Sequence, residues 1–184
     1  MAAKGTIGAK IVLEGEKEYR KALKEIKANQ AELRSEMKLC QTEYKSSQNS
    51  LDALKKKHEI LTKQIDTQTQ KVQLHQKAME TSAQKEELAA KKVEELQTAL
   101  DKATAEFNEM QSSSDTTKEA LDAQGKTVDD LKQKLNRATE NYDKAAQKTQ
   151  SYQTSVNYAQ AELKNMETEL QNTEKYMQEA EKST

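Results

Sequence analysis

Apolar residues recur with a period of seven along most of the chain. With Leu23 as the first position a of a heptad abcdefg, one register runs to Ala180 without an insertion or a deletion. Between these residues 34 of the 46 a and d positions are apolar, against 18 of the other 112, and twelve of those 18 are alanine. Heptads sustained beyond three or four predict coiled-coil helices. The chain is therefore expected to be all-α.

The a and d positions form a single apolar stripe, here called the seam. Its larger aliphatic and aromatic members are Leu23, Ile26, Leu33, Leu51, Leu54, Leu61, Ile65, Val72, Val93, Leu96, Leu100, Phe107, Leu121, Val128, Leu131, Leu135, Val156, Leu163 and Leu170. Polar residues interrupt the seam at Gln30, His58, Gln68, His75, Ser82 and Glu86. Polar side chains at such positions set register at a cost in stability, so we interpret them as polar layers rather than as a ligand site.

Two polar runs, at residues 45–50 and 111–117, are the expected breaks in the helix. Ser50 is placed to cap a helix beginning at Leu51, and Thr116 with Glu119 has the spacing of a capping box. The expected organisation is an N-terminal arm over residues 1–15 and a coiled-coil region over residues 16–184 with possible breaks near 45–50 and 111–117.

A long helix with an exposed seam needs a partner helix. The partner is either another copy, in a dimer or trimer, or the same chain folded back into a hairpin bundle. A hairpin turning near Ser113 brings three pairs of flanking residues together, namely Lys57 with Glu169, Lys55 with Glu174, and Lys92 with Lys134. The last pair is unfavourable, and the register that never slips favours a continuous rod of roughly 235 Å over residues 23–180.

The first residues follow a different pattern. Alternate positions are apolar, at Ile7, Ala9, Ile11 and Leu13, which predicts one short β-strand. Gly15 ends it, and Glu16 and Glu18 then fall in the first turn of a helix, where the helix dipole favours acids. A lone strand needs a partner, so the sequence predicts pairing with a copy from another subunit, pairing with a separate protein, or a flexible arm.

Composition removes several classes of function. Charged residues make up 33% and apolar residues 34%, with no proline, no tryptophan and four glycines. A chain this polar cannot bury the compact core of most enzymes, and the absence of proline argues against disorder. The net charge of −1 gives no basic footprint for direct nucleic-acid binding, and no run is apolar enough for a membrane span. The expectation is an intracellular protein without a membrane segment.

Candidate chemistry is scarce. The sequence has no glycine-rich phosphate loop, no zinc-ligand spacing and no nucleophile elbow. His58 and His75 are 17 positions apart, so one helix cannot bring them to one metal. Cys40, the single cysteine, is expected to be a small core residue that could also crosslink two parallel chains. We therefore expect no enzyme activity, no cofactor and no metal.

One resemblance goes beyond periodicity. Residues 5–26 read GTIGAKIVLEGEKEYRKALKEI. This stretch resembles the opening of tail tape measure proteins from phages and prophages of Gram-positive bacteria. The similarity continues through LRSEMKL at 33–39, LTKQI at 61–65, YQTSV at 152–156 and AQAELKNME at 159–167.

The resemblance implies a helical structural protein that lies in the lumen of the tail tube of the virion and whose length sets tube length. Its implied partners are tube subunits, tail tip or baseplate proteins and tail assembly chaperones, met in the host cytoplasm during assembly. Tape measure proteins are usually longer, which implies an N-terminal fragment or an unusually short member. A coiled-coil adaptor or tether unrelated to tails is the alternative.

Overall fold

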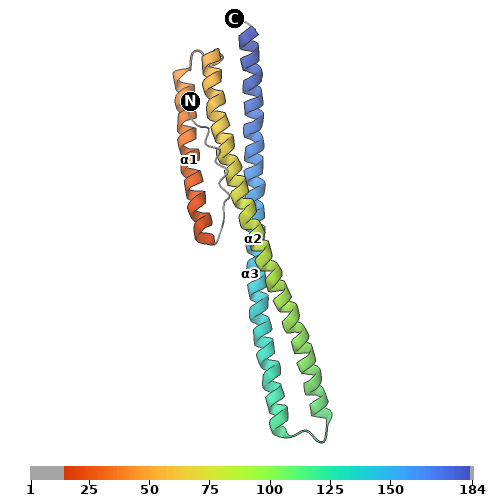
Figure 1. The fold of residues 1–184 in the computed structure, drawn as a ribbon. Helices are drawn as coiled ribbons and strands as arrows, with labels where there is room; N and C mark the ends of the chain where they lie inside the picture. Colours follow the sequence, from red (N-terminus) through yellow and green to blue (C-terminus); the bar gives the residue numbers. More distant parts are fainter. Residues whose placement is uncertain (1–14, 183–184) are drawn as a thin grey trace, which may run out of the picture. The chain divides into compact units, whose positions relative to one another are not determined.

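The computed structural model describes residues 15–182, which fold into three long α-helices (Figure 1). These are α1 (Glu16–Glu43), α2 (Leu51–Ser112) and α3 (Lys118–Lys182), of 28, 62 and 65 residues. The all-α expectation is confirmed for the part of the chain that is described, where no strand occurs. The strand predicted at Ile7, Ala9, Ile11 and Leu13 lies outside the described residues.

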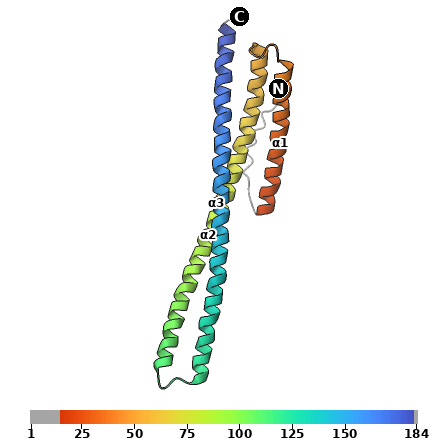
Figure 2. The ribbon, with the colours of Figure 1, turned by 180° about the vertical axis from the view of Figure 1, so that it is seen from behind.

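The chain folds back on itself in two compact units. The first unit combines residues up to Ala78 with residues from Tyr152 onward, so it contains α1, the start of α2 and the end of α3. The second unit, Met79–Ser151, is a hairpin made from the rest of α2 and α3 (Figure 2). The continuous rod favoured by the register is therefore wrong for this structure. A helix of the same chain is present at a high effective concentration, so it can cover the seam without a second copy of the chain.

Polar residues begin both later helices. The Ser50 Oγ atom accepts a hydrogen bond from the Ala53 N–H at 3.3 Å, so this predicted cap is confirmed. At α3 the cap is Thr117, whose Oγ1 atom accepts from the Ala120 N–H at 3.2 Å. The expected capping box at Thr116 is wrong by one residue, because the helix begins one position later, at Lys118.

Many of the buried residues belong to the seam. In the first unit Leu54, Leu61 and Val156 are 1–5% exposed. In the second unit the leucines and methionines of the seam are only half-buried, whereas Val128, Ala103 and Ala138 are buried. The core of the first unit is therefore more completely buried than the seam of the two-helix hairpin, whose large side chains keep contact with solvent.

Ion pairs fix how α2 and α3 are aligned in the first unit. Lys57 Nζ lies 2.8 Å from Glu169 Oε1, which confirms the pairing expected of a hairpin. Glu174 bonds His58 Nε2 at 3.1 Å instead of the expected Lys55. His58 lies about one helical turn after Lys55 on α2. The predicted antiparallel alignment of α2 and α3 is therefore confirmed, whereas the predicted partner of Glu174 is wrong.

Candidate functional site

The most specific arrangement in the first unit is a buried polar layer that joins all three helices. Gln30 Nε2 on α1 donates to Gln68 Oε1 on α2 at 2.6 Å, and Gln68 Nε2 donates to the Ala159 carbonyl on α3 at 2.8 Å. Gln68 has no exposed surface, and Gln30 is 8% exposed. Because a buried amide without partners is costly, this layer favours the one alignment in which all its bonds are made.

A carboxylate extends the same layer to the surface. Glu162 Oε2 accepts from Gln68 Nε2 and from Lys71 Nζ, both at 2.9 Å. The hydrogen bond from Lys71 is the main reason why the pKa of Glu162 is lowered, and burial opposes it. The layer therefore holds a charged pair at its rim and neutral amides at its centre.

A second polar layer contains aromatic residues. Tyr19 on α1 and His75 on α2 are joined by a 2.8 Å hydrogen bond between the hydroxyl and Nδ1. The Tyr19 ring also meets Tyr152 on α3 edge-on, with ring centroids 5.2 Å apart. This layer again takes one residue from each helix, which is what a register-setting contact requires.

The surroundings of His75 favour its neutral form. Burial, followed by the charges of Lys71 and Lys27, lowers its pKa from the usual 6.5, although Glu162 acts in the opposite direction. The Nδ1 atom of a neutral ring can accept a hydrogen bond from the Tyr19 hydroxyl. Burial in turn raises the pKa of Tyr19, so the hydroxyl stays a donor.

The second unit carries a simpler polar contact on its seam. Thr149 Oγ1 donates to Ser82 Oγ at 3.1 Å, joining α3 to α2. Closer to the turn, Gln124 Nε2 on α3 donates to the Ala103 carbonyl on α2 at 3.1 Å. Most polar seam positions predicted from the sequence thus pair with a neighbouring helix in this structure.

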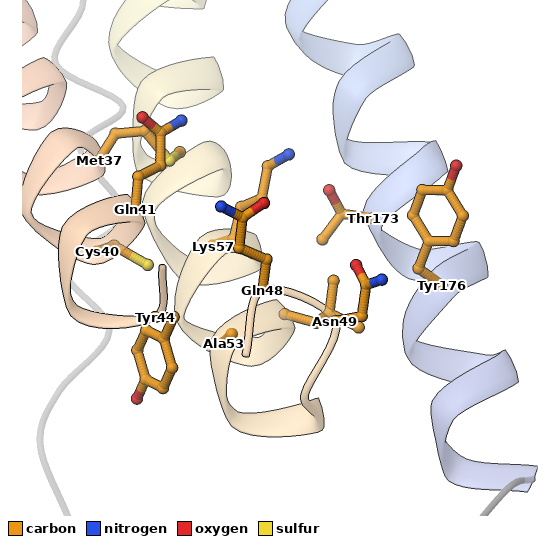
Figure 3. Close-up of a pocket in the computed structure, with 11 residues that line it drawn as sticks. Met37, Cys40, Gln41, Tyr44, Gln48, Asn49, Ala53, Lys57, Thr173 and Tyr176 are labelled. Carbon is orange, nitrogen blue, oxygen red and sulfur yellow. The ribbon is translucent and has the colours of Figure 1, made fainter. Parts of the chain in front are cut away.

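A pocket of about 370 Å³ lies beside the turn between α1 and α2 (Figure 3). Its wall includes Cys40 and Tyr44 from the end of α1, Lys57 from α2 and Tyr176 from α3. Cys40 is buried, and burial is the main cause that raises the pKa of its thiol. A raised pKa disfavours the thiolate, which is the nucleophilic form of cysteine.

Sequence reasoning missed a second row of buried residues on α2. Between Leu23 and Ala180, six apolar residues other than alanine lie off the seam, and five of them occupy heptad position c: Leu39, Ile60, Leu74, Leu88 and Tyr158. Ile60 and Leu74 are 1% and 0% exposed, whereas Leu88 is 66% exposed. The signal was available, because these three α2 residues repeat every 14 positions on one face.

The histidines and acids do not combine into a metal centre. His58 bonds Glu174 and His75 bonds Tyr19, so the two rings belong to different layers. Over residues 15–182 no group of three or more His, Cys, Asp or Glu side chains could hold a metal ion. Across the same range, every helix is too polar to cross a membrane.

Comparisons of the chain with protein-family models, with curated proteins and with solved structures give no match.

Proposed function

We propose that this chain is the N-terminal part of a tape measure protein of a phage or phage-like tail, with a structural and not a catalytic role. The observation that carries the proposal is the stretch at residues 5–26, whose sequence resembles the opening of that family. The long helices that follow, with one heptad register from Leu23 to Ala180, are of the kind that such a role needs.

In this proposal the helices act in the tail lumen, where they help to initiate assembly and set the length of the tube. A fully helical chain of 184 residues reaches roughly 275 Å at 1.5 Å per residue, whereas α3 alone reaches roughly 98 Å. The ruler therefore works in an opened form of the chain. Tube subunits, tail tip or baseplate proteins and tail assembly chaperones are its partners, and the segment with Ile7, Ala9, Ile11 and Leu13 pairs with one of them.

Both turns are compatible with such opening. The residues between the helices, 44–50 and 113–117, contain neither proline nor glycine, and no described residue has a positive φ. The backbone of the first turn makes hydrogen bonds between residues three positions apart, for example from the Ser47 N–H to the Tyr44 carbonyl at 2.9 Å. Because the heptad register continues through both turns, joining the helices would produce one uninterrupted seam.

The test is tail length in a strain that carries the altered gene. Removal of residues 100–106 together with 124–130 takes one heptad from each arm of the hairpin and keeps both registers. We expect tails about 21 Å shorter in electron micrographs, and tails about 21 Å longer when the same segments are duplicated. Unchanged tail length in both strains would refute the ruler role.

A matched control separates length from register. A single serine inserted after Asp115 changes the extended length by only about 1.5 Å but shifts the heptad phase of α3 by about 100°. If the opened form is used, this insertion should impair tail assembly more than an insertion of seven residues. Absence of the protein from purified tails would favour the alternative role of a coiled-coil tether.

A further inference from the structure

The second unit carries an open groove of about 590 Å³ between α2 and α3. Four of its lining residues are seam residues at position d, two from each helix, and the others are polar: Ala89, Leu96, Leu131, Ala138, Lys92, Lys134, Arg137 and Asn141. Within each helix the two d residues are seven positions apart. This spacing matches the repeat of a helix laid along the groove.

The charge of the groove differs from that of its surroundings. Residues 79–151 contain 15 acidic and 11 basic side chains, a net charge of −4, yet the groove is lined by three cations and no carboxylate. Lys92 pairs with Glu95 on its own helix at 3.1 Å. Among the described residues, Lys134 and Arg137 have no carboxylate partner. The groove therefore presents two unneutralised cations beside an apolar floor.

The first unit shows what covers this side of α2. Here α1 packs on the d and g positions of α2, since Gln64 at g donates to the Leu33 carbonyl at 3.3 Å and Gln68 at d bonds Gln30. The adjoining c residues Ile60 and Leu74 are buried as well. A helix of this chain thus already occupies that side of α2 within the first unit.

The same side of α2 is uncovered in the second unit. Lys92 is a g residue and Leu96 a d residue, and Leu88 continues the c row of Ile60 and Leu74 but is 66% exposed. Leu88 lies one turn before Lys92 on this face. Figure 1 shows α2 and α3 as the two helices of this hairpin. Three features, namely the half-buried Leu96 and Leu131, the exposed Leu88 and the two free cations, indicate that a third helix could pack here.

We propose that this groove binds an amphipathic α-helix of another protein, with apolar residues at heptad spacing and carboxylates flanking them. The apolar residues sit on Leu96 and Leu131, and the small Ala89 and Ala138 leave room for larger side chains. The flanking carboxylates meet Lys134 and Arg137. The inference stands independently of the tail proposal, because it uses the packing of the helices and not the sequence resemblance.

The test uses a fluorescent synthetic helix with leucine at a and d and glutamate at e and g, titrated with the full chain and followed by anisotropy. A matched peptide has lysine at e and g. We expect the glutamate peptide to bind and the lysine peptide to bind at least about tenfold more weakly, since charge complementarity decides between partners. No binding of the glutamate peptide would overturn the proposal.

Two charge-reversal variants locate the binding. K134E/R137E should weaken binding of the glutamate peptide by about tenfold or more and should improve binding of the lysine peptide. K126E/K144E makes the same change on the same helix at exposed positions outside the groove, and should have less than about a threefold effect. Equal losses in both variants would refute a specific site. Sedimentation equilibrium measures whether the chain associates with itself. If it does, and if K134E/R137E converts it to a monomer, the groove binds a second copy of the chain, which also overturns the proposal.

Discussion

The glutamine layer makes a quantitative prediction about the first unit. The Q30L substitution removes the donor that reaches Gln68 Oε1 at 2.6 Å. Because Gln68 is 0% exposed, no water can replace that donor without a rearrangement. A buried polar group left without its partner costs about 1–3 kcal/mol, and burial of the new leucine offsets part of that cost. We expect Q30L to destabilise the chain by about 1–2 kcal/mol.

The double variant Q30L/Q68L should behave differently, because it removes both partners of the bond. Replacing a buried hydrogen-bonded pair by apolar groups of similar shape is often close to neutral. The double variant should therefore be less destabilised than the sum of Q30L and Q68L, with an interaction energy of about 1–3 kcal/mol. A change of 2 kcal/mol corresponds to roughly 4–8 °C in Tm for a chain of this size.

Urea denaturation followed by far-UV circular dichroism measures these free energies, provided that the m value is the same in all variants. The matched control is Q124L, which changes a d-position glutamine of the second unit that shares no partner with Gln30. Q30L and Q124L should be additive within about 0.5 kcal/mol. If Q30L and Q68L were equally additive, the layer would contribute no coupling and the reasoning would fail.

Two further predictions concern charge. The pKa of His75 is lower in the folded chain than in the unfolded chain, so the unfolded chain takes up the proton first as the pH falls. The free energy of unfolding should therefore fall as the pH drops below about 6.5. The H75Q variant should flatten this part of the profile of unfolding free energy against pH, and an unchanged slope would contradict the assignment. The K57E variant replaces an ion pair by a repulsion with Glu169 and should lower the free energy of unfolding by about 0.5–1 kcal/mol, since both side chains are partly exposed. The swapped pair K57E/E169K should recover most of that loss in the same denaturation assay, and no recovery would argue against this alignment of α2 and α3.

Much of the fold follows from the sequence because one physical rule dominates it. Burying the seam requires a neighbouring helix, and the a and d positions identify which face is buried. The seam residues Leu54, Leu61 and Val156 are accordingly among the least exposed in the structure. The polar layers could also be located in this way, as at Gln68 and His75, because a polar residue on the seam must find a partner when it is buried.

The direction of chain folding could not be derived in the same way. The seam is equally satisfied by a rod of several chains and by a folded-back chain, and neither turn contains a residue that demands a turn. Position c escaped notice for a related reason. Ile60 and Leu74 become core residues only because α1 is a third neighbour, and the same kind of position at Leu88 stays exposed. Heptad periodicity identifies the face that packs against a neighbouring helix, but it does not predict how many helices pack there.

The continuity of the register across the turns is the feature that the folded-back structure alone does not require. A hairpin needs matching seams on its arms, but it places no condition on the number of residues in the turn. After each turn the heptad can resume at any of seven positions. Two turns that both keep the same register by chance would therefore occur in roughly one of fifty sequences. An opened helix, in contrast, needs an uninterrupted phase through both turns. The unbroken heptad phase therefore supports the proposed opened form, whereas the polar layer of Gln30 and Gln68 stabilises the folded one.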